Sequence, residues 1–443
     1  MKFATRLLGV VFLFVWLAPR AQADVAILLE EPYSYDGGFA GAGHAAIYLT
    51  RVCAESPTIL RRCRPGETGA VLSRYRRMDG YDWIAVPLTA YLYAVDTPGD
   101  VPLYADSRLV ALPRDRYRRE HLEGIAHDNR GGKAPGGDWP QLVGEAYDRT
   151  LYGFQIQTSA SRDDKFIQAY NSQPNVTSYK FVSNNCADFV REVVNFYYPN
   201  AVKRSLTADL DVMSPKHAAK SLVQYSKPHP ELHFTSLVIP QVPGTIRRSR
   251  PVRGLLESVF MAKKYEAPIV FFHPFIAAGF ASAYLLGGRF NPAHNALVYD
   301  PSGDLETPLT AEQRRTYGKD LSALMRNSPG RVAGAKAESW KHIQAGAQER
   351  LDESGRPVIE APSEAGPVQI GLSRANVLNN GAAPELAQGL LEACLREELR
   401  RGRAPKVSDI ELKSDWLILQ SAISRHSANA AGLDLSSLRV DPY

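Results

Sequence analysis

The segment from Cys186 to Tyr198 constrains the fold of this chain most tightly. Its apolar residues recur at the three- and four-residue spacing of one helix face. A helix this short is stable in a protein only when its apolar face packs against a core. Pro199 ends the segment, and Ser and Asn residues just before it, Asn185 among them, are good N-caps. The apolar stripe consists of Phe189, Val190, Val193, Val194 and Tyr197.

Short strand-like runs precede this helix, and further helical segments lie between them and it. β-branched and aromatic residues mark the runs as strands. This order predicts an α+β fold rather than regular βαβ alternation. The strand-like runs are Val25 to Leu29, Ala45 to Val52, Ala70 to Tyr75 and Trp83 to Val86; the helical segments are Arg114 to Asn129 and Trp139 to Arg149.

Residues 1–23 have the three parts of a signal peptide. Lys2 and Arg6 are basic, the run from Leu7 to Ala18 is apolar, and residues 21–23 read Ala-Gln-Ala, a typical cleavage site. The apolar run is shorter than the roughly 20 residues that span a bilayer. We therefore expect an exported mature chain, periplasmic or secreted, that begins near Asp24.

Composition changes divide the mature chain into three parts. We expect a first domain at 24–235, an apolar and basic connecting segment at 236–306, and a mostly helical C-terminal region at 307–443. Residues 267–288 carry no charge, but Pro268, Pro274 and His273 interrupt the run, and basic residues flank it on the side expected to be exported. A buried or membrane-apposed segment is therefore favoured over a membrane span.

Charge and motif spacing argue against several classes of function. The formal net charge of +5 is small for 443 residues, so nucleic-acid binding is not indicated. His229 and His233 have HxxxH spacing, but adjacent prolines prevent the helix that a zinc pair needs. Residues 41–46 fit a degenerate dinucleotide-binding pattern, but a strand-like run follows where a helix is required. We expect no metal and no cofactor.

The four cysteines divide by their surroundings. Cys53 and Cys63 lie ten positions apart after a strand-like run, and in an exported protein such a pair most simply forms a disulfide, with two unpaired thiols as the alternative. Cys394 lies on the apolar stripe of a predicted helix and is expected to be buried. Cys186 lies in the first turn of its helix, where backbone N–H groups and the helix dipole are expected to lower a thiol pKa. Without a nearby base, a buried structural cysteine remains the alternative.

His44 is the candidate base. It follows Gly41-Ala42-Gly43 and begins a strand-like run, so small neighbours leave room for its ring. In a cysteine hydrolase, a histidine on a neighbouring strand takes the thiol proton and later protonates the leaving group.

Three segments in this order resemble a known group of enzymes. They are GHAAIYL around His44, Gly144-Glu145-Ala146-Tyr147-Asp148, and NNCADFVREVV around Cys186. They look like the circularly permuted papain-like thiol hydrolases, related to NlpC-type cell-wall peptidases and to lecithin retinol acyltransferase. The resemblance covers roughly residues 24–200. It implies a small antiparallel sheet packed on helices, with Cys186 as nucleophile, His44 as base, and Tyr147 and Asp148 at the substrate groove.

The group also has a third polar residue that orients the histidine, and this sequence does not show it at the usual spacing. Four side chains after His44 are candidates. The main two are Glu67 and Ser73, and the others are Glu55 and Tyr75. A histidine without such a partner is held less firmly in its reactive tautomer, which weakens catalysis.

Three functions remain open at this point. The first is an exported cysteine hydrolase or acyl-transfer enzyme that acts on amide or ester bonds, with peptidoglycan peptide as the favoured substrate and Asn185 at the oxyanion-binding helix start. The second is a hydrolase or acyltransferase of lipid esters or amides. The third is a non-catalytic envelope protein that uses the same fold for binding or scaffolding.

Overall fold

The computed structural model describes an α+β protein built on one large mixed sheet. It describes residues 24–33, 42–76, 78–102, 105–205, 211–242, 246–254, 289–301, 348–361 and 366–371, with scattered positions between and beyond these ranges. The sheet has eight strands in the order β10-β9-β8-β7-β1-β2-β5-β6. Neighbouring strands are antiparallel except β8 and β9, which are parallel. The strands are β1 (Asp24–Glu30), β2 (His44–Leu49), β5 (Ala70–Ser73), β6 (Ile84–Pro87), β7 (Leu151–Gln157), β8 (Thr235–Ile239), β9 (Leu297–Tyr299) and β10 (Leu305–Glu306).

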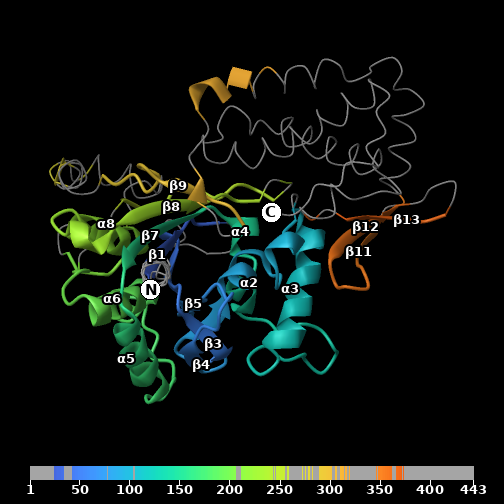
Figure 1. The fold of residues 1–443 in the computed structure, drawn as a ribbon, viewed down its shortest axis with the longest axis horizontal. Helices are drawn as coiled ribbons and strands as arrows, with labels where there is room; N and C mark the ends of the chain where they lie inside the picture. Colours follow the sequence, from blue (N-terminus) through green and yellow to red (C-terminus); the bar gives the residue numbers. More distant parts are fainter. Residues whose placement is uncertain are drawn as a thin grey trace, which may run out of the picture.

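Helices cover both faces of this sheet. In Figure 1, α5, α6 and α8 lie on one side of the central strands, and α2 and α3 lie on the other. The α-helices are α2 (Leu88–Tyr93), α3 (Ser107–His121), α4 (Glu145–Asp148), α5 (Ala160–Asn171), α6 (Cys186–Tyr197) and α8 (Pro215–Ser226). Short 3₁₀ helices in the described part of the chain are η2 (Pro98–Asp100), η3 (Trp139–Leu142) and η4 (Pro230–Leu232).

The alternation of side chains along β1 and β2 defines two cores. Ile27 and Ala45 point to the side of α6 and α8, which we call the α6 face. Leu28 and Ala46 point to the side of α2, α3 and α4, which we call the α3 face. Because β1 is covered on both faces, it reads as an almost continuous apolar run rather than as an alternating strand.

Two smaller sheets flank the main one. The hairpin of β3 (Val52–Ser56) and β4 (Ile59–Arg62) carries a disulfide between Cys53 and Cys63, whose Cα atoms are 4.9 Å apart. This confirms the predicted disulfide. A three-stranded antiparallel sheet contains β11 (Gln348–Leu351), β12 (Pro357–Ala361) and β13 (Val368–Gly371). It packs beside α3, where Arg116 donates a hydrogen bond to the Gly355 carbonyl at 2.7 Å.

The large sheet continues past the domain boundary that we placed at residue 235. β8 pairs with β7 from Thr235 onward, and β9 and β10 extend the sheet further. The segment 236–306 therefore contributes strands to the first domain, at odds with the predicted connecting role. Because β8 is buried on both faces, the apolar residues 237–239 do not alternate with polar ones. The sequence therefore contained no strand signal at this position. The described part of 307–443 contains the sheet β11–β13, which the predicted helical region did not include.

Several expectations lie outside the described residues. These are the signal peptide at 1–23, the helix that contains Cys394, and almost all of the uncharged segment 267–288. Among the residues that the structure describes, no helix has the length and apolarity needed to cross a bilayer.

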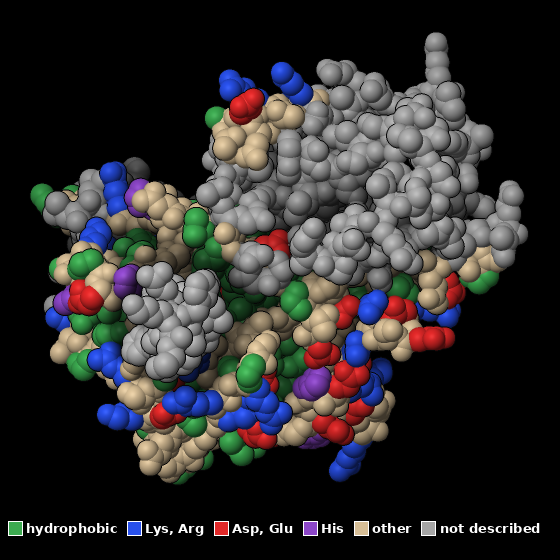
Figure 2. All heavy atoms as spheres, in the orientation of Figure 1, with side chains coloured by type: hydrophobic (Ala, Val, Ile, Leu, Met, Phe, Trp, Pro, Cys, Tyr) green, Lys and Arg blue, Asp and Glu red, His purple; other side chains and the backbone are tan. Residues whose placement is uncertain are grey.

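On the face shown in Figure 2, Lys and Arg side chains are interspersed with Asp and Glu over the described surface. Ion pairs link such charges: Arg119 of α3 contacts both Asp115 at 2.9 Å and Asp128 at 2.8 Å.

Candidate active site

Helix α6 begins at Cys186, as predicted, and Asn185 is its N-cap. The Asn185 side chain accepts hydrogen bonds from the N–H groups of Ala187 at 2.8 Å and Asp188 at 3.0 Å. The Asp188 carboxylate in turn accepts a hydrogen bond from the Asn185 N–H at 3.2 Å, which completes a capping box. The Asn185 amide also donates to the carbonyls of Phe181 and Met213. The cap thus fixes both the helix start and the loop that leads to Cys186.

The Cys186 sulfur lies against strand β2. The backbone N–H groups of Ala45 and Ala187 lie near the sulfur and act to lower its pKa, which favours the thiolate. β5 pairs with β2 only at residues 47–49, so the N–H of Ala45 lies beyond the end of β5 and is available to the sulfur. This contact places Cys186 next to the residue that follows His44.

The thiol pKa is nevertheless raised to about 11, which contradicts the lowered pKa expected from the helix start. The residue is 9% exposed, and burial is the largest cause, because it disfavours the charged thiolate. The charges of Glu30 and Asp188 raise the pKa further. Desolvation and two nearby carboxylates therefore outweigh the helix terminus and the two backbone donors.

His44 is the first residue of β2, and backbone geometry brings it close to β1. Gly43 has φ of 66°, and a Cβ at that position would lie 2.0 Å from the Glu30 carbonyl oxygen. A glycine is therefore required there for the close approach. His44 pairs in register with Glu30, so the two side chains share the α3 face.

The His44 imidazole is buried and stacks on Tyr75. The ring centroids are 4.1 Å apart with an interplanar angle of 9°. Burial, and then the charge of Arg149, lower the pKa of His44 well below 6.5. The ring is therefore neutral at pH 7. Its Nε2 atom is buried and has no hydrogen-bond partner in the described part of the chain.

The structure brings Cys186 and His44 to the same point of β2, but from different sides. Cys186 belongs to the helix on the α6 face, and His44 shares the α3 face with Ala46. Among the described residues, no hydrogen bond joins the sulfur to the imidazole. The resting site is thus a neutral thiol beside a neutral imidazole, with no preformed thiolate–imidazolium pair.

Of the four candidates for an orienting residue, Tyr75 contacts His44. Glu67 lies beside the β3–β4 hairpin, where Arg61 donates two hydrogen bonds of 2.7 Å to it and lowers its pKa to about 2. Glu55 is bound to the same Arg61 at 2.5 Å. Neither acid is placed to orient His44. Ser73 is buried at the end of β5, and by alternation it lies on the α3 face, but the contact to the ring is made by Tyr75.

A buried cluster of charged residues that the sequence did not reveal lies beside His44. Glu30, Glu145 and Arg149 are each 0% exposed. Arg149 Nε is 2.5 Å from a Glu145 carboxylate oxygen, and Arg149 Nη1 is 3.5 Å from Glu30. The Tyr91 hydroxyl donates a hydrogen bond to Glu30. Burial raises the pKa of Glu145 well above 4.5. Glu145 belongs to the Gly-Glu-Ala-Tyr-Asp segment. The sequence motif therefore includes a member of this cluster, although the sequence analysis assigned the functional role to Tyr147 and Asp148.

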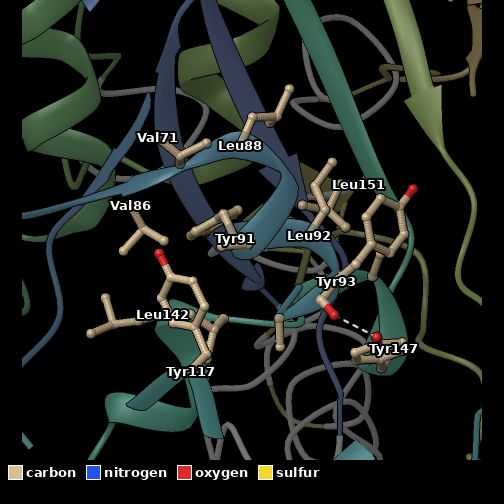
Figure 3. Close-up of a cluster of buried hydrophobic side chains, with 14 of the residues drawn as sticks. Val71, Val86, Leu88, Tyr91, Leu92, Tyr93, Tyr117, Leu142, Tyr147 and Leu151 are labelled. Atoms are coloured by element: carbon tan, nitrogen blue, oxygen red, sulfur yellow. Dashed lines mark hydrogen bonds between the residues drawn. The ribbon is translucent and has the colours of Figure 1, made fainter. Parts of the chain in front are cut away.

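Two further residues of that motif, Tyr147 and Asp148, were assigned to a substrate groove. Tyr147 is 0% exposed, and its hydroxyl donates a hydrogen bond to the Tyr93 carbonyl in the core of the α3 face, as Figure 3 shows. The Asp148 carboxylate accepts a hydrogen bond from Arg114 at 2.6 Å. The groove role predicted for Tyr147 is therefore wrong, because its side chain is enclosed, whereas the role predicted for Asp148, which is engaged in an ion pair with Arg114, stays a prediction.

Two groups of side chains have the spacing of metal ligands among the described residues. One contains the disulfide Cys53–Cys63, whose sulfur atoms are bonded to each other and do not form thiolate ligands. The other consists of the exposed side chains of Asp96, Glu120 and His121. Neither involves Cys186 or His44.

Comparison with protein-family models finds no match, and comparison with curated proteins finds none either. Among solved structures, the crystal structure of a type VI secretion system effector, TseH, aligns with a TM-score of 0.24 and 12% sequence identity. The alignment covers 50% of this chain and 95% of the effector chain. A likeness this low carries no argument about fold or activity, so the interpretation of the site rests on its own geometry.

Proposed function

We propose that this protein is an exported cysteine hydrolase or acyl-transfer enzyme with a permuted papain-like arrangement, in which Cys186 is the nucleophile and His44 the base. One observation carries the proposal: the sulfur at the capped start of α6 lies near the backbone N–H of Ala45, the residue next to His44. The two side chains come from segments about 140 residues apart in the order that the resemblance implies. The disulfide Cys53–Cys63 supports export, because such bonds persist in oxidising compartments.

The neutral state of both groups defines the first chemical step. The Cys186 thiol attacks the carbonyl carbon of an amide or ester while His44 Nε2 takes the thiol proton, so charge never builds on an isolated thiolate. The imidazole has to move from its stack on Tyr75 to the sulfur for this transfer. His44 then protonates the leaving amine or alcohol, and a thioester with Cys186 remains. Water, or another acyl acceptor, attacks the thioester and regenerates the thiol.

Backbone donors at the helix start suit the negative charge of the tetrahedral intermediate. The N–H of Ala187 lies in the first turn of α6, where the helix dipole adds to its effect. The N–H of Ala45 acts on the same sulfur from the strand and lowers its pKa. Peptidoglycan peptide is the substrate that an exported enzyme of this type would meet, and we adopt it as the leading substrate.

A lipid ester or amide is the second candidate, and a surface feature favours it. Phe181 is 48% exposed and Val182 is 58% exposed in the loop just before Cys186. Apolar surface beside a nucleophile suits an acyl chain, because burial of each CH₂ group stabilises the complex by about 0.8 kcal/mol.

A non-catalytic binding protein is the third candidate. The raised pKa of Cys186 and the lack of a hydrogen bond to His44 favour it over an enzyme. Under this alternative the protein binds cell-wall peptide or lipid and releases no product.

Product formation separates the three candidates. The purified protein is incubated with peptidoglycan-derived peptides and, separately, with phospholipid vesicles, and products are identified by mass spectrometry. The proposal predicts cleaved peptide with the wild type and at least about 100-fold less with His44→Ala, since a general base contributes about 10²–10⁴-fold. His229→Ala, which changes an exposed histidine, is the matched control. Cleaved lipid without cleaved peptide would favour the second candidate, and no product from either substrate would favour the third.

A further inference from the structure

Residues 246–254 cross the end of the large sheet at which β1 ends and β2 begins. We call this segment the arginine strap. Ile246, at its start, packs on the core of the α3 face, whereas Val252 belongs to the core of the α6 face. The strap therefore passes from one face of the sheet to the other around the ends of the strands.

Hydrogen bonds hold the arginine strap against the ends of β1 and β7. The Ser249 hydroxyl donates to the Glu31 carboxylate at 2.7 Å and accepts a hydrogen bond from the Thr150 N–H at 3.0 Å. The Arg250 N–H donates to the Pro32 carbonyl at 3.0 Å. The sheet that carries the candidate active site thus fixes the position of the strap.

Pro32 connects the strap to the start of β2. A Cβ on Gly43 would lie 3.4 Å from the Pro32 Cδ, so these two residues pack against each other. Gly43 directly precedes His44. The arginine strap therefore lies at the catalytic end of the sheet.

Three arginines of the strap carry positive charge at the surface. Arg247 and Arg250 are exposed, and Arg253 is partly exposed. Within the described part of the chain, none of the three takes part in an ion pair. Arg248 differs, because it donates a hydrogen bond of 2.7 Å to the Gln241 carbonyl.

Two acids contact the strap, and both are engaged away from these arginines. Glu31 is 7% exposed and accepts the hydrogen bond from Ser249. Glu257 accepts a hydrogen bond from the Gly254 N–H at 3.2 Å and pairs with Lys216 at 2.7 Å. Neither carboxylate neutralises the exposed charge of the strap.

The spread of the charges favours an extended anionic surface over a single anion. Six residues of chain can span up to about 20 Å, and the strap reaches from one face of the sheet to the other, so Arg247 and Arg253 do not converge on one point. A single phosphate is best held by arginines that approach it together. The headgroups of an anionic bilayer present many phosphates side by side, which matches three charges in a row.

Apolar side chains that suit the same partner follow the strap in the sequence. Phe272 and Phe275 belong to the uncharged segment 267–288, and they are 76% and 91% exposed. They lie three residues apart in helical backbone, so their rings are neighbours on one side. Exposed aromatic residues combined with basic ones are typical of segments that lie in the interface of an anionic bilayer.

We propose that the protein docks on the surface of an anionic phospholipid bilayer. Arg247, Arg250 and Arg253 bind the lipid phosphates, and Phe272 and Phe275 insert at the level of the headgroups. The inference goes beyond the proposed reaction and does not depend on it. Docking brings the catalytic end of the sheet to the membrane.

Co-sedimentation with phospholipid vesicles tests the docking. The Cys186→Ala protein is purified after export, so that no lipid is consumed, and is mixed with vesicles of phosphatidylglycerol or of phosphatidylcholine. We expect binding to phosphatidylglycerol that weakens as salt is raised, because salt screens the charges. Binding to phosphatidylcholine should be about 100-fold weaker, at about fivefold for each arginine.

Two sets of substitutions separate the charged part from the apolar part. Replacing Arg247, Arg250 and Arg253 by Gln should weaken binding to phosphatidylglycerol by about 100-fold. Replacing Phe272 and Phe275 by Ser should weaken it by at least about tenfold, because two rings are no longer buried. Wild-type affinity in either variant would overturn the proposal.

The charge-matched control replaces three exposed basic residues elsewhere, Arg130, Lys133 and Lys165, by Gln. It should bind like the wild type, and an equal loss of binding would show an effect of net charge alone and overturn the role of the strap. Release of the protein by inorganic phosphate at constant ionic strength would show a site for a single anion and overturn the bilayer surface. Equal binding to both kinds of vesicle, or binding to neither, would overturn the docking. The comparison of vesicles uses the unchanged strap, so it decides even where a variant fails to fold.

Discussion

Cys186 should react with iodoacetamide far more slowly than an ordinary cysteine at neutral pH. Burial raises its pKa from the ordinary value of 9.0 to about 11. The thiolate fraction falls tenfold for each pH unit below the pKa, so at pH 7 Cys186 holds about 100-fold less thiolate than a thiol with the ordinary pKa. Because alkylation proceeds through the thiolate, the rate constant should fall by about the same factor, and limited access to the sulfur should lower it further.

The assay follows alkylation by intact-mass spectrometry from pH 6 to pH 11 in a Cys394→Ser background. Cys53 and Cys63 are joined in a disulfide and do not react, so the mass increase reports Cys186. The logarithm of the rate should rise by one unit per pH unit until about pH 11. The urea-unfolded protein is the control and should level off near pH 9. A plateau of the folded protein below pH 8 would show a stabilised thiolate and refute the argument from burial.

The same shift makes folding stability depend on pH. A thiol is neutral when protonated, and the folded state holds this proton more tightly than the unfolded state does. The stabilisation that this tightly held proton gives the folded state is therefore fully present below about pH 9, and it is lost as the pH rises toward 11. Two pKa units correspond to about 3 kcal/mol. In urea unfolding at pH 8 and pH 10.5, the wild type should lose more stability than Cys186→Ala, and equal losses would contradict the shift.

Four further sets of substitutions test local features of the protein. Asn185→Ala should lower the free energy of unfolding by about 1–3 kcal/mol in urea, because it removes the cap and two further hydrogen bonds; a loss below about 0.5 kcal/mol would mean that the cap is dispensable. Gly43→Ala should destabilise the protein by more than about 1 kcal/mol in the same assay, since a Cβ there meets backbone; an unchanged midpoint would contradict the close approach. Replacing Cys53 and Cys63 by Ser should lower the melting temperature, with a loss of about 2–3 kcal/mol for a loop of this length; calorimetry with no shift would argue against the bond. Tyr75→Phe should keep most of the peptide-cleaving kcat, whereas Tyr75→Leu should lower kcat more than KM and shift its pH profile; equal effects would rule out a role for the ring stack.

The local elements around the site could be predicted because short-range patterns encode them. The helix at Cys186 and its Asn185 cap follow from apolar spacing and a capping residue, and the structure confirms both. The strand that begins at His44 was predicted within one residue of its start. The disulfide pairing followed from spacing and from the expected compartment.

The parts that could not be predicted depend on tertiary burial. The backbone N–H groups at the helix start do lower the pKa of Cys186, as expected. The depth at which the sulfur is buried cannot be predicted from the sequence, and burial decides the pKa. Glu30 and Arg149 look like ordinary charged residues in the sequence, and only the pairing of β1 with β2 and β7 brings them beside His44. Tyr75 was one of four candidates, behind Glu67 and Ser73, and only the fold around the end of β5 places its ring on the imidazole.

Covalent labelling by a carbonyl-directed, mechanism-based peptidyl probe tests the central claim most directly. The probe reacts in a step that needs both the Cys186 thiol and a base, and peptide mapping identifies the labelled residue. The account predicts a label on Cys186 in the wild type that is lost in His44→Ala and retained in His229→Ala. Labelling of Cys186 at the same rate in His44→Ala as in the wild type would contradict it.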